Sequence, residues 1–366
     1  MVNQLLKFIG KTFTGMDARD LLCLCQIIWA LIQERTVNLS KLALHCHYKS
    51  RRREASYRRL QRFLDRLILS QASLASFVLS FIKGPYVLAL DRTNWMFGKT
   101  PINILTLSVV WKGTAIPLFW RMLPHKGCSA PEDRIALMEE FVALKGRGCI
   151  KALVMDREFI GSVWLSYLQA QDMTFHVRLR NNIKIGRLHK ELVFPRDDLN
   201  RLRCHEVYHL PGQRRIGGKK DAMKLFVSAT RSSEGDLVLI ASPKDQANAL
   251  ECYAQRWGIE TLFGCLKTRG FCFEDTHLTD PSKISHLMVP LTVAFFWAFR
   301  VGVWLNEKKE VRFKAHRRRA VSLFRLGLDA LVKTTKNLGK WFLSLLFDSK
   351  HPPTPSVSSL LRAGVF

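Results

Sequence analysis

The stretch Tyr86–Trp120, YVLALDRTNWMFGKTPINILTLSVVWKGTAIPLFW, is the most informative part of the sequence for the fold class. It begins with a short apolar run, Tyr86–Leu90. Two longer runs rich in β-branched and aromatic residues follow at 102–111 and 114–120. Lys112-Gly113 lies between them, as expected for the turn of a hairpin. The stretch therefore predicts three strands.

The next 60 or so residues add helices and further strands to this beginning. Residues 132–145 have the apolar spacing of a helix, and 150–155 form another short apolar strand. A helix at 161–171 and a strand at 173–179 complete the pattern. Three strands, helix, strand, helix, strand is typical of an α/β domain built on a mixed sheet.

The segments on either side of residues 81–180 have other patterns. Residues 1–80 have helical periodicity without a convincing strand, and 181–245 consist of short strands and turns, as in a β-rich insertion. Helices return at 246–310, and a basic C-terminal region, 311–366, follows as a candidate dimerisation segment. The apolar stretch 287–305 is interrupted by Pro290 and Arg300, so a buried core helix is expected rather than a membrane span.

The charge of the chain points to a polyanionic partner. There are 57 Lys and Arg against 30 Asp and Glu, which gives a net charge of +27 and a pI of about 10.1. Because such self-repulsion is relieved by neutralisation, nucleic acid is the favoured partner. An anionic membrane surface and a solvated basic face without a partner are the alternatives.

The nine cysteines are too scattered, and odd in number, for a disulfide framework. They are interpreted as small buried side chains in a reducing cytoplasm, and no secretory leader is visible. A zinc site from His45, Cys46 and His47 is a weak alternative, because adjacent ligands lack the usual spacing.

A basic cluster follows the first helices. Its cations crowd around Leu60, Phe63 and Leu64, which predicts a helix with an apolar seam and a cationic flank that contacts phosphates. The only acids within it are Glu54 and Asp65. The cations are Lys49, Arg51, Arg52, Arg53, Arg58, Arg59, Arg62 and Arg66.

Two aspartates follow two of the predicted strands. Asp91 ends the strand at 86–90, and Asp156 ends the strand at 150–155. Ligands of open α/β sheets gather at the carboxyl ends of strands, so both are candidate site residues. An aspartate in this position is also a common helix cap or turn residue.

A third candidate element lies in the helix expected around residue 260. Tyr253, Arg256, Glu260 and Lys267 have offsets of 0, 3, 7 and 14, which places them in one stripe about 60° wide. Gly264 shares the stripe and would let a ligand backbone approach. The apolar residues of the helix lie on a different side. The alternative interpretation of the stripe is a solvent-exposed helix face with salt bridges.

These residues carry a family resemblance. The spacing Tyr-x2-Arg-x3-Glu-x6-Lys resembles the YREK signature of bacterial insertion-sequence transposases, the insertion-sequence-four-like group of the DDE class. The strings Asp91-Arg92-Thr93-Asn94-Trp95 and Asp156-Arg157-Glu158-Phe159 are similar to its first two blocks. The segment Arg59–Leu64 is similar to the one that closes its N-terminal domain. The three blocks occur in order over roughly residues 40 to 330.

The resemblance implies an RNase H-like catalytic core in two parts, 81–180 and 246–310, behind a helical DNA-binding domain at 1–80. Asp91, Asp156 and Glu260 would bind two Mg²⁺ ions, with Mn²⁺ as a substitute, for phosphodiester hydrolysis and strand transfer. Tyr253, Arg256 and Lys267 would hold DNA phosphates. The implied partners are double-stranded DNA, both terminal inverted repeats and target, and a second copy in a synaptic homodimer. No membrane is implied; the expected location is the bacterial cytoplasm, at the nucleoid.

One departure concerns the hairpin intermediate of this group, in which an insertion-domain aromatic, often Trp, stacks a flipped base. Residues 181–245 contain no Trp, which leaves Phe194, Tyr208, Phe226 and, on the signature helix, Trp257 as stacking candidates. Two rivals remain for the whole chain: a DNA-binding protein that has lost catalysis, and an RNase H-like nuclease or junction resolvase that cuts without joining.

Overall fold

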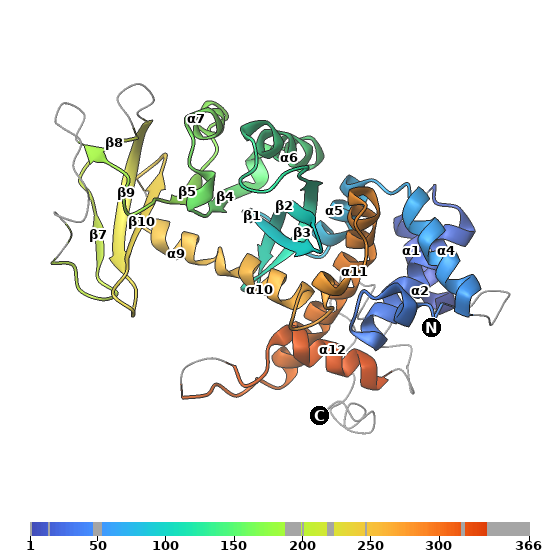
Figure 1. The fold of residues 1–366 in the computed structure, drawn as a ribbon. Coiled ribbons are helices and arrows are strands. Elements are labelled where there is room, and N and C mark those ends of the chain that lie inside the picture. Colours follow the sequence, from blue (N-terminus) through green and yellow to red (C-terminus); the bar gives the residue numbers. More distant parts are fainter. Residues whose placement is uncertain are drawn as a thin grey trace. The chain divides into compact units, whose positions relative to one another are not determined.

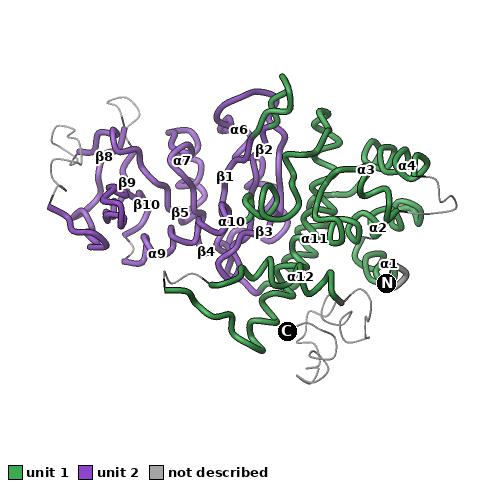
Figure 2. Tube along the Cα trace, turned by 60° about the horizontal axis from the view of Figure 1, so that its bottom comes forward, with its two compact units in different colours: residues 1–82, 95–102, 262–366 green, residues 83–94, 103–261 purple. Residues whose placement is uncertain are grey.

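The computed structural model describes residues 2–13, 15–46, 53–186, 199, 201–217, 223–245, 247–315 and 319–334. The chain divides into two compact units (Figure 2). Unit 1 comprises 1–82, 95–102 and 262–366, and unit 2 comprises 83–94 and 103–261. The division into five segments expected from sequence stays a prediction.

Unit 2 is built on a mixed sheet with strand order β3-β2-β1-β4-β5-β10-β9-β8-β6, and β7 pairs with β9 (Figure 1). β4 pairs in parallel with β1 and β5, whereas β3 is antiparallel to β2. The first five strands are β1 (Tyr86–Phe97), β2 (Thr100–Trp111), β3 (Thr114–Met122), β4 (Ile150–Met155) and β5 (Phe175–Arg178). The mixed α/β architecture expected from the sequence is confirmed.

The hairpin between β2 and β3 forms where the sequence predicts it. Lys112 and Gly113 both have positive φ, 50° and 79°, the backbone that a two-residue turn between twisted strands requires. Trp111 pairs with Thr114 across the turn. Glycine satisfies the second position without a steric penalty.

β1 is longer than predicted, and Asp91 lies within it rather than at its end. The apolar run stops at Leu90, but the strand continues with Thr93 and Trp95 buried and Asn94 exposed between them. Alternating burial is the pattern of a strand with one face in the core. The prediction relied on a continuous apolar run and so missed this second half of β1. The expectation of a strand end at Asp91 was therefore wrong.

The β-rich segment after β5 extends the same sheet. β10 (Leu237–Ser242) pairs antiparallel with β5 and with β9 (Met223–Arg231). The shorter strands are β6 (Ile185–Gly186), β7 (Val207–His209) and β8 (Arg214–Ile216). Buried His176 of β5 meets Ser242 of β10, with 2.8 Å between Nδ1 and Oγ.

Helices flank the sheet of unit 2. α6 (Pro131–Lys145) and α7 (Ser162–Ala170) lie on one face, and α9 (Ala249–Ala254) lies on the other (Figures 1 and 2). Two short 3₁₀ turns, η1 (Arg147–Cys149) and η2 (Arg157–Phe159), precede and follow β4. Both faces of the parallel strands are therefore covered, as their continuous apolar runs require.

Unit 1 is helical in its described residues, apart from the tip of the β1–β2 hairpin. Its central helix is α11 (Pro281–Lys308), which packs against α2, α4, α5 and α12. Gly302 of α11 and Gly327 of α12 meet so closely that a Cβ on either would collide with backbone of the other helix. The other elements are α1 (Val2–Thr12), α2 (Ala18–Glu34), α3 (Leu39–Leu42), α4 (Arg53–Arg66), α5 (Gln71–Leu79), η3 (Phe273–Asp275) and α12 (Leu323–Thr334).

α11 has the length and apolarity that could cross a membrane, and 94% of its most apolar window is buried inside the protein. Pro290 lies within the helix and is itself buried. A buried core helix, as the sequence predicts for 287–305, is what the structure shows.

Candidate active site

The strand register places Asp91 next to Asp156. β1 and β4 run in parallel, and their last registered pair is Leu90 with Met155. Asp91 and Asp156 are the next residues along the two strands, so the two carboxylates lie side by side at the point where β4 ends and β1 continues. Two residues separated by 65 positions in the chain thus become neighbours through one strand pairing.

The signature helix consists of two helices. α9 ends at Ala254, α10 (Trp257–Leu266) begins three residues later, and Arg256 lies in the turn between them. Gly258 explains the close fit at the start of α10: a Cβ there would lie 3.0 Å from the Ala115 nitrogen of β3. The expectation of one continuous helix was wrong. Between α9 and α10 the backbone N–H groups bond to carbonyls three residues earlier instead of four, and this tighter turn separates the two helices.

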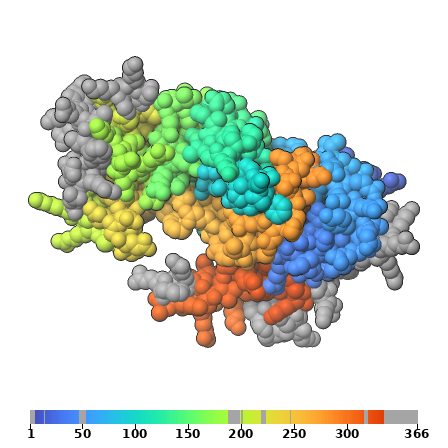
Figure 3. Space-filling view, viewed as in Figure 1, coloured from blue at the N-terminus to red at the C-terminus, as the bar shows by residue number. Residues whose placement is uncertain are grey.

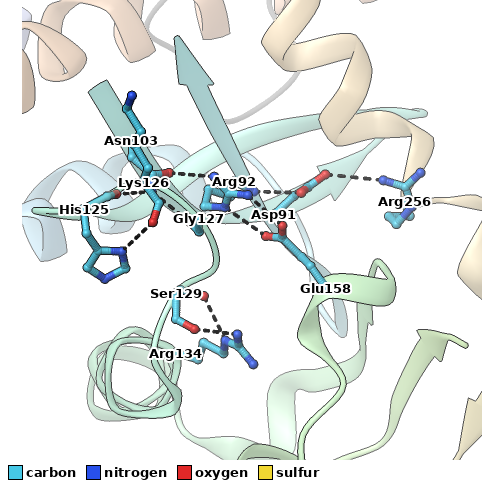
Figure 4. A network of polar contacts seen from close by, with 10 residues as sticks. All are labelled: Asp91, Arg92, Asn103, His125, Lys126, Gly127, Ser129, Arg134, Glu158 and Arg256. Atoms are coloured by element: carbon cyan, nitrogen blue, oxygen red, sulfur yellow. Dashed lines mark hydrogen bonds and ion pairs between the residues drawn. The ribbon is translucent and has the colours of Figure 1, made fainter. Parts of the chain in front are cut away.

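Arg256 connects the carboxylates of two elements. Its Nη1 donates to Asp91 Oδ2 at 3.3 Å (Figure 4). Its Nη2 donates to Glu260 Oε1. Its Nε donates to the Tyr253 hydroxyl at 3.1 Å. Burial disfavours the Arg256 charge, but Tyr253, Glu260 and Asp156 outweigh that cost and raise the pKa of the guanidinium. The predicted site residues Asp91, Asp156, Tyr253, Arg256 and Glu260 therefore come together in unit 2.

A second arginine supports the same edge of the sheet. Arg92 binds Glu158 twice, from Nε to Oε1 at 3.2 Å and from Nη2 to Oε2 at 3.0 Å. Its remaining Nη1 donates to Asn103 Oδ1 at 3.0 Å, and Asn103 Nδ2 donates to the carbonyls of His125 and Gly127 (Figure 4). This network joins β1, β2 and the segment that follows β4.

Arg134 of α6 completes the surroundings. It is buried, donates to both Ser129 Oγ and Ser129 O, and lies 5.0 Å from the centre of the Phe159 ring. Burial lowers the pKa of Arg134, against the opposing effect of Glu158. Sequence reasoning assigned no role to Arg92, Asn103, Arg134 or Glu158. The only available signal was that Arg92 and Glu158 stand in the two blocks next to the aspartates.

The two aspartates of this site are poorly compensated although Arg256 contacts Asp91. Burial raises the pKa of Asp91 to about 7; the Arg92 N–H and Arg256 lower it, and Glu158 and Asp156 add to the rise. Asp156 Oδ1 is buried without a hydrogen-bond partner. No group of three His, Cys, Asp or Glu side chains in the described ranges is close enough to hold a metal ion as it stands. Yet the buried carboxylate oxygens, and the unpartnered Asp156 Oδ1 among them, fit a hard divalent cation, which prefers carboxylate oxygen.

Lys267 and Gly264 have other neighbours in unit 1. Lys267 Nζ is 2.7 Å from Glu274 Oε1 and lies 5.4 Å from the centre of the Trp95 ring. A Cβ on Gly264 would collide with the guanidinium of Arg269. The space at Gly264 is filled by the end of the Arg269 side chain, and the approach of a ligand there stays a prediction. A phosphate contact by Lys267 stays a prediction.

The stacking candidates differ in accessibility. Trp257 is 65% exposed at the first position of α10, and Tyr208 of β7 is 43% exposed. Phe226 of β9 is half-buried, and Phe194 lies outside the described residues. Trp257 is therefore the aromatic near Arg256 with most surface to offer to a base.

The basic cluster falls largely on α4, whose apolar seam is confirmed: Leu60, Phe63 and Leu64 are buried. The surface of the N-terminal helices, blue in Figure 3, faces solvent in that view. Arg53, Arg58 and Arg62 are exposed. Lys49, Arg51 and Arg52 lie outside the described residues.

Arg59 and Arg66 of α4 have protein partners. Arg59 Nη2 donates to Gln26 Oε1 and to the Cys46 carbonyl, and Arg66 Nη2 lies 2.9 Å from Asp20 Oδ1. A phosphate contact through Arg59, expected from the sequence, would compete with these bonds inside the helical core.

The expectation of buried cysteines is confirmed for five of the nine and was wrong for the rest, because Cys128 and Cys204 are exposed and Cys149 and Cys272 are partly exposed. Cys23, Cys25, Cys46, Cys252 and Cys265 are buried free thiols, and burial raises the pKa of Cys46 to about 12. His45 contacts Glu34 at 2.5 Å, whereas His47 lies outside the described residues. A protonated, buried Cys46 is a poor metal ligand.

Residues 134–297 match the family model of the transposase DDE domain. This range contains Asp156 and Glu260 and begins after Asp91. Among solved structures, the chain is similar to a piggyBac transposase in a synaptic complex with hairpin DNA, with 11% identity and a TM-score of 0.47 over 100% of this chain and 81% of that one. No curated protein sequence matches the chain.

Proposed function

We propose that the chain is a DDE transposase of the YREK-signature group, which cuts and rejoins the ends of a mobile DNA element by a cut-and-paste route. The match of residues 134–297 to a transposase DDE domain supports DNA transposition in general. The observation that carries the finer proposal is the pairing of Leu90 with Met155, which brings Asp91 of β1 beside Asp156. Arg256 then joins Asp91 to Glu260.

The strand order supports an RNase H-like core as part of this proposal. β3-β2-β1 lie together, and β4 and β5 follow in parallel with β1. Helices cover both faces of these strands. Asp91 and Asp156 then follow the last registered pair of β1 and β4. In open sheets of this kind, ligands bind beyond the carboxyl ends of the parallel strands.

Asp91, Asp156 and Glu260 would hold two Mg²⁺ ions, or Mn²⁺ in their place. When bound, these ions would neutralise charge on the scissile phosphate and lower the pKa of the attacking water. The protein's own contribution is positional. Arg92 and Glu158 fix the two aspartate segments to each other, and Tyr253 orients Arg256. Arg256, beside this carboxylate set, would offer a planar fork to a DNA phosphate.

The remaining assignments follow from the same proposal. The substrates are double-stranded terminal inverted repeats and target DNA, with α4 and its exposed arginines at 1–80 as the region that binds the element end. Two copies of the chain act together, in the cytoplasm and at the nucleoid. An intermediate with a hairpin end would use Trp257 as its stacking surface.

The test is a reaction of the full chain on a labelled fragment that carries the inverted repeat flanking its own coding sequence, with a supercoiled target and Mg²⁺. We expect nicked, double-cut and joined products. Cutting without joining would instead identify a nuclease or resolvase of the same fold, and binding without cutting would identify a DNA-binding protein that has lost catalysis.

A further inference from the structure

A pocket of about 290 Å³ opens beside α4 in unit 1. Its polar lining comes from three separate segments: Asn38 and Ser40 around α3, Tyr57 and Gln61 on α4, and His277 after η3. Three aliphatic side chains complete the wall. The pocket lies wholly within one compact unit.

The polar groups of the pocket are held in place. Tyr57 and Gln61 are four residues apart on α4, so they share one face of the helix. Asn38 Oδ1 accepts from the Ser40 nitrogen at 3.0 Å, and this fixes the amide at the start of α3. The His277 ring packs edge-on against Phe97, with 5.3 Å between the ring centres. Asn38 and His277 are therefore fixed on one part of the wall, and Tyr57 and Gln61 lie together on another.

The chemistry of the lining selects the class of ligand. None of the lining residues is Asp, Glu, Lys or Arg, so a charged group would find no opposite charge inside. A phenol, two amides, a hydroxyl and an imidazole together offer several donors and acceptors and two aromatic rings. A flat neutral heterocycle matches such a wall, because it can stack on the rings and bond through its edge.

The helix face next to the pocket residues is cationic. Arg58 follows Tyr57 and Arg62 follows Gln61, so the two arginines share the adjoining face of α4, and both are exposed. Arg53 lies one turn before Tyr57 on the same helix and is also exposed. A ligand with a neutral ring and a flanking phosphate would match a polar wall beside a basic helix face.

We propose that this pocket binds a single unpaired nucleobase of DNA whose flanking phosphates contact Arg58 and Arg62. A base inside a duplex has its faces stacked and its pairing edge engaged, so only a base outside the stack can enter. Tyr57 and His277 provide the stacking surfaces, and Gln61 bonds the edge of the base. The proposal deepens the proposed function and rests on it, since it takes DNA to be the substrate.

The test compares three labelled duplexes of one sequence by fluorescence anisotropy with the full chain. One duplex is fully paired, one has a single bulged nucleotide, and one has an abasic residue at the bulge. We expect the bulged base to improve affinity about tenfold over the abasic bulge, the magnitude typical of stacking one base on an aromatic side chain. Tyr57→Ala and Gln61→Ala should remove this preference and leave the affinity for the paired duplex unchanged.

Three further variants make the result unambiguous. Ser40→Leu, which fills the pocket from the opposite wall, should also remove the preference. Arg58→Gln should weaken all three duplexes equally. Gln169→Ala, on α7 in unit 2, should change nothing.

Two outcomes have different meanings. Equal binding of the three duplexes by the wild-type chain, or a preference that survives Tyr57→Ala, Gln61→Ala and Ser40→Leu, overturns the base pocket and leaves the proposed transposase intact. A chain that binds none of the duplexes overturns the proposed function and the base pocket together.

Discussion

Arg92 and Glu158 form a two-pronged ion pair across 66 positions of sequence, with contacts of 3.2 and 3.0 Å and side chains only 14% and 21% exposed. Each residue lies next to, or two positions from, one of the aspartates of the candidate site. A pair with two parallel bonds fixes orientation as well as distance. The pair therefore holds the segments that carry Asp91 and Asp156 in one geometry.

We expect Arg92→Lys to lower the rate of DNA cleavage about tenfold to a hundredfold, because lysine cannot make the two parallel bonds, worth about 1.5–3 kcal/mol. Glu158→Gln should act similarly. The measurement is single-turnover cleavage of a labelled element end. A double exchange, Arg92→Glu with Glu158→Arg, should recover part of the loss. If both single variants cut at the wild-type rate, the pair does not position the site.

Arg256 contacts both Asp91 and Glu260, two of the three carboxylates that are proposed to hold a divalent ion. We expect Arg256→Ala to lower Tm by about 5 °C without metal, because it leaves a buried carboxylate without its partner. Added Mg²⁺ should raise the Tm of this variant more than that of the wild type. Arg121→Ala, which breaks a half-exposed pair with Glu140, is the control and should show no such difference. An equal Mg²⁺ effect on wild type and Arg256→Ala would argue against a metal at this position.

The strands and helices of unit 2 were largely predictable from sequence, and the contacts of the site were not. Ile150–Met155 is a strand with the predicted bounds, because a six-residue segment with five apolar residues between turn signals leaves few alternatives. The break before α10 depends on Gly258 approaching Ala115, a contact between distant segments. Likewise, the Arg92–Glu158 pair exists only after β1 and β4 have paired, so no local pattern reveals it.

Binding of DNA along α4 should depend steeply on salt. The slope of log affinity against log salt is negative for such binding. We expect Arg58→Gln and Arg62→Gln each to make it less steep by about 0.9, the value for one lost phosphate contact. Arg147→Gln, an exposed arginine of η1 in unit 2, is the control and should leave the slope unchanged. A mobility-shift titration over salt measures it. Unchanged slopes in both α4 variants would remove this helix from the DNA interface.

His176 should make the protein less stable in mild acid. Burial lowers the pKa of His176 to about 4 from its usual 6.5, so the folded protein keeps it neutral while the unfolded chain protonates. Stability is therefore lost as the pH falls from about 6.5 to about 4, by on the order of 3 kcal/mol from this residue. In urea unfolding at several pH values, His176→Gln, which can still bond Ser242, should lose less stability over this range. An identical pH profile would show that His176 does not titrate between the two states.

We propose that Asp91, Asp156 and Glu260 form one metal-dependent site. The most direct measurement is Mg²⁺-dependent cleavage of a labelled element end by Asp91→Asn, Asp156→Asn and Glu260→Gln, each nearly identical in shape to the wild-type residue. Glu251→Gln, an exposed residue of α9, is the control. We predict that each of the three variants loses cleavage while its affinity for the element end stays within about twofold, as expected if the residues bind metal rather than DNA. Near wild-type cleavage by any one of them would contradict the claim for that residue.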